Sequence, residues 1–251
     1  HALFSSDLVG SAQLRMELDQ VKKYAHIFWD LDHTLWDFTA NSRATLAELY
    51  DQEDLGSKGI PDTDAFIDAY EEVNLGLWSS YEKGQLKKEV LRVLRFHNTL
   101  IQFGISDNET AERMGRDYLE LCPRKPLLIP GAFALLQDLA PHYSMHIITN
   151  GFEEVQHVKL ACSGITEFFD VVVTSEQAGA RKPDLRIFDH ALHLAKANEQ
   201  NSLMIGDNPE ADMAGARNAG WDHAHYAAET AQCALSTFRL KHLDDLRPIL
   251  L

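Results

Sequence analysis

Short apolar segments that lead into polar residues occur once near the start of the chain and repeatedly in its second half. The first covers residues 24–29 and leads into Asp30. The others cover residues 143–148, 170–174, 202–206 and 221–226. Aromatic and β-branched runs of this length, bounded by Gly, Asn or Asp, indicate buried strands. The segment at residues 221–226 is expected to be the last strand.

Segments with apolar residues at helical spacing separate the predicted strands. Four of them follow the first strand directly, at residues 40–50, 63–78, 87–103 and 108–121. The later ones cover residues 131–139, 152–162, 185–197 and 211–219, and a short closing helix is expected over residues 238–251. Strands that alternate with helices predict an α/β fold with a parallel sheet. The first four helices would form a small bundle of their own.

Composition limits the possible partners. The chain has 251 residues, 45% of them hydrophobic, and no apolar run approaches the roughly 20 residues that span a bilayer. With 23 basic and 38 acidic residues, the net charge is −15, which argues against a nucleic acid polymer. A small phosphate ester stays compatible, because a bound cation would supply local positive charge. We expect no membrane or nucleic acid partner, and a monomer or homodimer.

Cysteines, histidines and the N-terminus carry little chemistry. The three cysteines are odd in number and lack metal-ligand spacing, which indicates a reducing cytoplasm; we expect Cys122, Cys162 and Cys233 to be small buried residues. The twelve histidines are scattered, so we expect them on the surface or in packing roles. Residues before about Met16 do not fit the pattern, and residues 1–23 are expected to be an N-terminal extension or leader.

Charged and hydroxyl side chains lie where the predicted strands end. Asp30 and Asp32 follow the first strand. Thr149 ends the second, and Asp207 follows the fourth. Charges rarely end a buried strand unless they are paired or bind a metal, and in a continued strand Asp30 and Asp32 would share one face. Because parallel α/β sheets bind ligands at the carboxyl ends of their strands, we expect these residues and Lys182 to meet in one crevice.

In this order, the motifs resemble those of the haloacid dehalogenase-like hydrolase superfamily, over nearly the whole chain from about Tyr24. The matching motifs are Asp30-x-Asp32-x-Thr34, Thr149, Lys182, and Gly206-Asp207 with Asp212. The resemblance implies a three-layer, Rossmann-like α/β/α core of residues 24–38 and 124–251. It also implies an α-helical cap of residues 39–123 that closes over the crevice and excludes water. The alternative is that these are ordinary helices packed against the sheet.

The resemblance further implies a Mg²⁺-dependent phosphatase that works through an aspartyl-phosphate. Asp30 would attack phosphorus, Asp32 would act as general acid and then as general base, and Lys182 would stabilise Asp30 and the phosphoryl charge. Asp30 and Asp207 would bind Mg²⁺ by side chain and Asp32 by its backbone carbonyl. The residues expected to hold the phosphoryl oxygens are Thr149, Asn150, Gly151 and Lys182. The supporting residues are Thr34, which would orient Asp32, and Asp212, near the metal.

The substrate is less constrained. Residues 148–152 with Gln156, and residues 77–84 with Arg95-Phe96, resemble the branch that contains bacterial pyrimidine 5′-nucleotidases and is close to acylneuraminate 9-phosphatases. We therefore expect a phosphomonoesterase for a small phosphorylated metabolite, either a nucleoside 5′-monophosphate or a sugar phosphate. Residues that could contact the rest of the substrate, with core packing as the alternative, are Trp36, Phe38 and Trp78 for stacking and Arg95 for an anion.

Other functions on the same scaffold stay open. A phosphomutase would use the same two aspartates, but it needs a cap that shields the intermediate from water. A dehalogenase expels halide and characteristically lacks the second aspartate, so Asp32 favours phosphate chemistry. From a different class, a non-catalytic phosphate-binding module would retain the fold, although every catalytic position of the motifs is occupied here.

Overall fold

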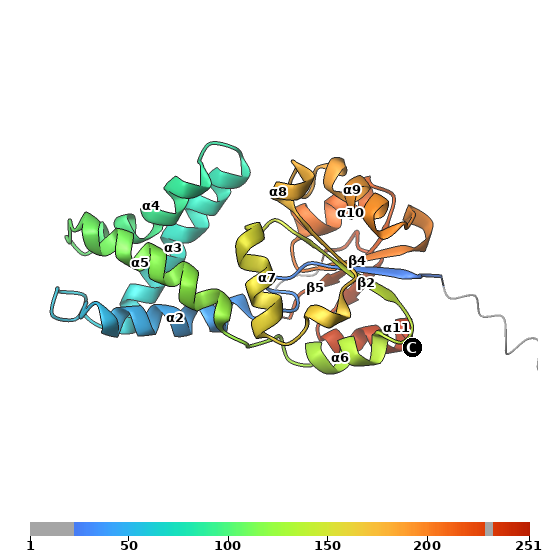
Figure 1. Cartoon of the computed structure of the whole chain (residues 1–251), viewed down its shortest axis with the longest axis horizontal. Helices are drawn as coiled ribbons and strands as arrows, with labels where there is room; N and C mark the ends of the chain where they lie inside the picture. Colours follow the sequence, from blue (N-terminus) through green and yellow to red (C-terminus); the bar gives the residue numbers. More distant parts are fainter. Residues whose placement is uncertain (1–22, 229–232) are drawn as a thin grey trace, which may run out of the picture.

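A parallel six-stranded sheet forms the core of the computed structural model, which describes residues 23–228 and 233–251 (Figure 1). The strand order is β3-β2-β1-β4-β5-β6, and each of the five pairings is parallel. The strands are β1 (His26–Trp29), β2 (Ser144–Thr149), β3 (Val171–Thr174), β4 (Ser202–Gly206), β5 (Asp222–Tyr226) and β6 (Phe238–Leu240). The predicted parallel α/β sheet is therefore confirmed.

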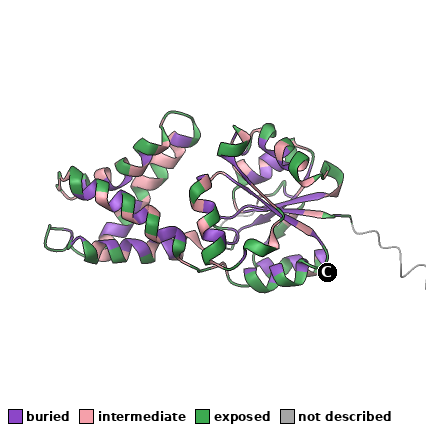
Figure 2. Cartoon of the chain, in the orientation of Figure 1, coloured by how far each residue is buried: buried purple, intermediate pink, exposed green. Residues whose placement is uncertain are grey.

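Helices cover both faces of this sheet (Figure 1). They are α6 (Ala132–Leu139), α7 (Glu153–Cys162), α8 (Ser175–Ala178), α9 (Leu185–Ala195), α10 (Gly215–Asn218) and α11 (Arg247–Leu250). Shorter turns are η1 (Cys122–Arg124), η2 (Thr166–Phe168), η3 (Glu199–Asn201), η4 (Pro209–Ala214) and η5 (Leu243–Leu246). Trp29 packs in the core with α6 and α11, and Phe28 packs on the opposite face with α9 and α10. This alternation arises because successive strand side chains point to opposite faces, and since both faces are covered, strands such as β4 are buried along their whole length (Figure 2).

Four helices between β1 and β2 form a lobe beside the sheet rather than flat against either face (Figure 1). They are α2 (Phe38–Gln52), α3 (Thr63–Glu82), α4 (Lys88–Gln102) and α5 (Asn108–Leu121). Helices that are consecutive in sequence pack on one another, and α2 also contacts α5. Tyr70, Phe96 and Tyr118 meet at the centre, with ring centroids 5.0 to 5.7 Å apart. The lobe thus has an aromatic core of its own.

Register places three strand ends at one edge of the sheet. Trp29 at the end of β1 pairs with Ile147 of β2 on one side and with Ile205 of β4 on the other. The chain therefore leaves all three strands at nearly the same level. Polar residues that follow these strands are brought together even though they are far apart in sequence.

The C-terminal segment differs from the prediction. The sequence pattern predicts one helix over residues 238–251, but Phe238–Leu240 form β6, so β5 is not the last strand. Residues Ala224–Tyr226 of β5 would otherwise expose unpaired backbone groups at the sheet edge, and pairing with β6 satisfies them. Helical structure is confined to η5 and α11.

The cysteine prediction holds only in part. Cys122 is buried as expected. Cys162, the last residue of α7, is exposed, and Cys233 is partly exposed. Among residues 23–228 and 233–251, no helix combines the length and apolar character that crossing a membrane requires. The expected N-terminal extension, up to residue 22, lies outside the described residues.

Candidate active site

The chain turns sharply directly after β1. The amide of Asp30 still donates to the carbonyl of Ile205 in β4 (2.8 Å), but three later amides fold back onto the carbonyl of Leu31. His33 adopts a positive φ of 65°, which is uncommon for a residue other than glycine. The spacing of the two aspartates predicts a strand that continues through Asp32, but the strand ends before it. The two carboxylates therefore have different surroundings.

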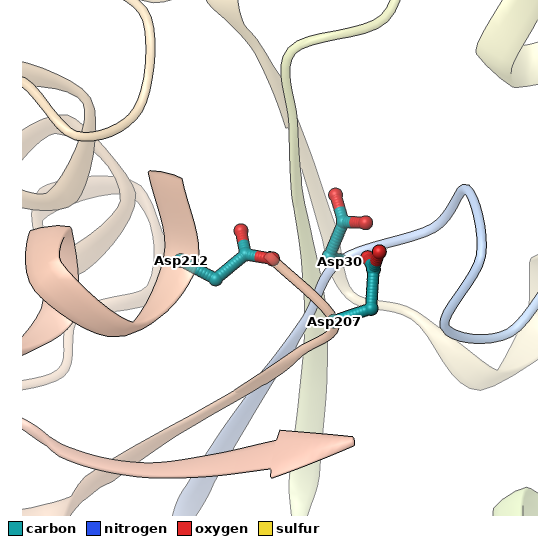
Figure 3. A group of neighbouring side chains, drawn as sticks. All are labelled: Asp30, Asp207 and Asp212. Carbon is teal, nitrogen blue, oxygen red and sulfur yellow. The ribbon is translucent and has the colours of Figure 1, made fainter. Parts of the chain in front are cut away.

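Three carboxylates converge at the sheet edge. Figure 3 shows the side chains of Asp30, Asp207 and Asp212 directed toward one another, and one oxygen of each lies within 4.8 Å of the others. The buried Lys182 reaches into this cluster, with Nζ 2.6 Å from Asp30 Oδ1 and 2.6 Å from Asp212 Oδ1. Lys182 also donates to the carbonyl of Ile148 (2.7 Å). One ammonium therefore faces three carboxylates.

The excess negative charge perturbs the acids. Burial, with added repulsion from Asp212 and Asp207, raises the pKa of Asp30 well above its usual value despite the attraction of Lys182. Burial and the Asp212 carboxylate raise the pKa of Asp207 to about 6. Burial opposes the charge on Lys182, but Asp212 and Asp30 together raise its pKa. A divalent cation with a preference for hard oxygen ligands, such as Mg²⁺, would relieve this crowding, so the donor set fits the metal.

Asp212 is held in place by the backbone around it. The amide of Asn208 donates to Asp212 Oδ2 (3.0 Å). A Cβ at Gly206 would lie 2.3 Å from the same oxygen, so this close approach requires glycine at the end of β4. Thr34 donates to Asp207 Oδ1 (3.2 Å). The structure thus places Thr34 against Asp207 and not against Asp32, which the sequence analysis expected it to orient.

The residues after β2 form a second part of the site. Thr149 Oγ1 accepts hydrogen bonds from the amide of Gly151 (3.1 Å) and from Gln156 Nε2 (3.2 Å). The Asn150 side chain is engaged with the backbone of Lys182: Nδ2 donates to its carbonyl (3.1 Å) and Oδ1 accepts from its amide (2.9 Å). Asn150 therefore anchors the loop that carries Lys182, and its side-chain amide is already occupied.

Asp32 lies in a separate network on α7. Lys159 Nζ is 2.5 Å from Asp32 Oδ1, and Gln156 Nε2 donates to Oδ2 (2.9 Å). Burial would raise the pKa of Asp32, but the charge and hydrogen bond of Lys159 outweigh it, so the pKa is lowered. The ammonium also lies over the Trp36 ring, 4.4 Å from its centroid. The structure thus pairs Asp30 and Asp32 with two different lysines.

The motifs do not reveal Lys159. A signal does exist in the sequence, because Gln156 and Lys159 are three residues apart and therefore share one face of the helix that follows Thr149-Asn150-Gly151. Both are buried in α7, where a charged residue would be costly without a partner. A search for buried charge on that helix face would have identified Lys159.

A cavity of about 550 Å³ lies between the lobe and this edge of the sheet. Its core side includes every predicted site residue except Thr34, and its lobe side comes from α2 and α3. Phe38 and Trp78 line it, as expected for residues that could stack on a substrate. Trp36 is fully buried and does not line the cavity, so for Trp36 the alternative, core packing, applies. The volume is typical of sites for small-molecule ligands.

Comparisons with known proteins agree with this geometry. Residues 24–220 match the family described as haloacid dehalogenase-like hydrolase. The chain is 33% identical over 233 residues to the pyrimidine 5′-nucleotidase YjjG of Escherichia coli, covering 91% of this chain and 98% of the relative. It is 31% identical over 229 residues to the pyrimidine 5′-nucleotidase PynA of Streptococcus pneumoniae, covering 89% and 93%.

A solved structure shows the same fold. The putative HAD-hydrolase YfnB from Bacillus subtilis, described as bound to magnesium, superposes with a TM-score of 0.82 at 27% identity. The match covers 91% of this chain and 99% of the YfnB chain. Because the match covers more of this chain than either the sheet domain or the helical lobe contains, the similarity extends over both.

Proposed function

Because the chain belongs to the haloacid dehalogenase-like hydrolases, we propose that it is a Mg²⁺-dependent phosphomonoesterase for a small phosphorylated metabolite, foremost a pyrimidine nucleoside 5′-monophosphate. One observation carries the proposal: Asp30 and Asp32 both line the cavity, and each is held by its own lysine. A hydrolase that expels halide needs no second acid, so Asp32 favours phosphate esters. The activities named for the two relatives favour a nucleotide.

In the proposed reaction, Asp30 and Asp32 share the work of two displacements. An oxygen of Asp30 attacks phosphorus, the bond from phosphorus to the ester oxygen breaks, and Asp32 gives its proton to that oxygen. Water then attacks the phosphorus of the aspartyl-phosphate and passes a proton to Asp32, while the bond to Asp30 breaks and inorganic phosphate leaves. Both side chains return to their starting state.

Lys159 prepares Asp32 for one half of this cycle. By favouring the ionised carboxylate, it leaves Asp32 ready to accept a proton from water in the second displacement. In the first displacement Asp32 carries a proton, and its attraction to Lys159 is then weaker because a neutral carboxyl group has no net charge. Lys159 therefore favours the base form of Asp32, which the second displacement needs, over its acid form.

The cluster of acids supplies the metal ligands in this proposal. Asp30 and Asp207 would hold Mg²⁺ by side chain and Asp32 by its carbonyl, with Asp212 in support. The bound ion would reduce the repulsion between a carboxylate and a phosphate dianion. The phosphoryl oxygens would be held by Thr149, the amides of Asn150 and Gly151, and Lys182.

The helical lobe serves as the cap in this proposal. We assign residues 39–123 to a cap and residues 24–38 with 124–251 to the catalytic core. The support is the cavity, which has the acids on its core side and α2 and α3 of the lobe on the other. A cap in this place would exclude water and contact the part of the substrate that leaves.

The proposed compartment is the cytoplasm. All three cysteines are free, and free thiols persist in reducing compartments.

The net charge of −15 also favours a small ester over a polymeric anion as the substrate. A single phosphate group needs only a local positive charge, which a divalent cation held by the acidic cluster would supply together with Lys182.

Phosphate release from a panel of phosphomonoesters with Mg²⁺ tests the function. Asp30→Asn should lower the rate by about 10³-fold or more, because an amide is neither a nucleophile nor a good Mg²⁺ ligand. Asp189→Asn, which changes an exposed aspartate of α9, is the matched control and should leave the rate unchanged. An Asp30→Asn rate within about tenfold of the parent would contradict the covalent mechanism. No release from any ester would contradict the function itself.

A further inference from the structure

A buried arginine of the lobe, next to the cavity, has two N–H-bearing nitrogens without a hydrogen-bond partner in the described part of the chain. Arg95 of α4 is 4% exposed, and its Nε and Nη2 donate to no acceptor among the described residues. The guanidinium lies over the rings of Tyr118 and Phe96, with centroids at 4.4 and 5.5 Å. Stacking stabilises the charge, but it does not satisfy the in-plane N–H groups of Nε and Nη2. A buried cation of this kind indicates an acceptor supplied by a ligand.

Arg95 lines a small pocket that adjoins the main cavity. This pocket has a volume of about 50 Å³ and shares Asp32, Phe38, Trp78 and Gly151 with the main cavity. Asp32 is the proposed acid for the departing oxygen, so the pocket lies on the side of the leaving group. The volume corresponds to about four water molecules, which suits the edge of one ring better than a fused ring pair.

A second unsatisfied polar atom belongs to the same pocket. Gln156 lines it and is fully buried, and its Oε1 accepts no hydrogen bond among the described residues. The Nε2 end of the amide is the engaged one, because it donates to both Asp32 Oδ2 (2.9 Å) and Thr149 Oγ1 (3.2 Å), which leaves Oε1 facing the other way. The pocket therefore offers donors from Arg95 and an acceptor from Gln156.

We propose that Arg95 and Gln156 recognise the base of a nucleotide substrate, namely a single ring with a carbonyl oxygen for Arg95 and an adjacent ring N–H for Gln156. Uracil and thymine present this edge, whereas cytosine has no ring N–H beside its carbonyl. A sugar carboxylate would satisfy Arg95 but would be repelled by Gln156 Oε1, since neither oxygen can donate. The inference rests on the proposed function, because it presupposes a nucleotide.

The walls of the pocket suit a planar ring. Phe38, Trp78, Tyr118 and Phe152 all contribute to it, and Trp78 stacks on Phe152 with centroids 5.2 Å apart. Aromatic walls exclude water from the polar edge, so that a hydrogen bond formed there contributes more than it would in solvent. Recognition of this kind discriminates strongly against an analogue that leaves the buried groups unpaired.

The test compares dUMP, dCMP, a purine nucleotide (dGMP), a sugar-acid phosphate and deoxyribose 5-phosphate as substrates of wild-type protein, Arg95→Met and Arg95→Lys. Wild-type protein should prefer dUMP over each of the others. Arg95→Met should lower kcat/KM for dUMP by about 10- to 100-fold, mainly through KM, and change the rate with deoxyribose 5-phosphate by less than about threefold. Arg95→Lys should lie between, because an ammonium restores the charge but not the planar pair of donors. Arg116→Met, an exposed arginine of the same lobe, is the matched control.

Three results would overturn the inference. An equal loss with dUMP and deoxyribose 5-phosphate in Arg95→Met would assign Arg95 to the fold of the lobe. Wild-type preference for dCMP or a purine nucleotide would remove the proposed carbonyl and ring N–H pair. Wild-type preference for a sugar-acid phosphate, lost in Arg95→Met, would make the ligand a carboxylate. Failure of wild-type protein with every monoester is a different outcome, since it removes the proposed function as well.

Discussion

Gly151→Ala should damage the site through Gln156 and not through the backbone. Gly151 has no positive φ, so alanine can adopt the same conformation. Its Cβ, however, would lie 1.4 Å from Gln156 Nε2 and 2.5 Å from Cδ, whereas ordinary contacts begin at 3.4 Å. The amide nitrogen must therefore move by about 2 Å. Gln156 is fully buried, so its side chain has no solvent-filled space to move into.

A displacement of this size breaks two hydrogen bonds of Gln156 Nε2. One goes to Asp32 Oδ2 (2.9 Å) and the other to Thr149 Oγ1 (3.2 Å). A bond to a charged group contributes about 1.5–3 kcal/mol and a neutral one about 0.5–1.5 kcal/mol, so the free energy of unfolding should fall by about 2–4.5 kcal/mol. Because Asp32 keeps only Lys159 to position it, kcat/KM should fall by about 10- to 100-fold. Urea unfolding and phosphate release measure the two effects.

A double-mutant cycle separates this cause from others. Gln156→Ala alone should lose the same bonds, and adding Gly151→Ala to it should cost little more, because the obstacle is gone. If the two changes instead add to within about 0.5 kcal/mol, the clash with Gln156 is not the cause and the reasoning is refuted. Gly76→Ala is the matched control: nothing lies within 4 Å of a Cβ built there, so no loss of stability or activity is expected.

Asp32→Asn should slow esters of poor leaving groups most, and an activated aryl phosphate should give a burst of aryl alcohol before slow turnover; equal losses without a burst would remove its acid–base role. Chelation should abolish phosphate release, Mg²⁺ should restore it and Ca²⁺ should inhibit, and full activity in excess chelator would contradict metal binding by Asp207. Burial and the neighbouring His26 lower the pKa of His146 from 6.5 to about 4, so between these values only the unfolded chain binds the proton. As the pH falls through this range, the free energy of unfolding should drop by up to about 3 kcal/mol, and His146→Leu should flatten the profile measured by urea unfolding at each pH.

The sheet could be predicted because its signal is local. Each predicted strand is an apolar run with its own turn residues, and five of the six strands follow from such runs. The polar residues at the ends of β1, β2 and β4 then had to lie at one edge, since parallel strands share a direction. The encounter of Asp30, Asp207 and Lys182 is a consequence of that rule combined with the family's motifs.

The parts that could not be predicted depend on contacts between distant segments. Strand β6 has only three residues, and its pairing with β5 is what distinguishes it from the helix that its sequence permits. The choice of Thr34 between Asp32 and Asp207 depends on a turn that includes a positive φ at His33. The unsatisfied Nε and Nη2 of Arg95 follow from the packing of α4 on α5, and no local pattern encodes an absent partner.

The two aspartates of the first motif gain different properties from one turn of the chain. Burial and two neighbouring carboxylates raise the pKa of Asp30, whereas Lys159 lowers the pKa of Asp32 despite its burial. Environments that push paired acids apart assign them different tasks. The direction is informative, because a nucleophile must be ionised and the surroundings of Asp30 oppose ionisation. A cation held between these carboxylates would favour the ionised form of Asp30 as well as neutralise the phosphate. In the proposed mechanism, the surroundings of Asp30 would therefore make the reaction depend on a metal, in addition to the charge of the substrate.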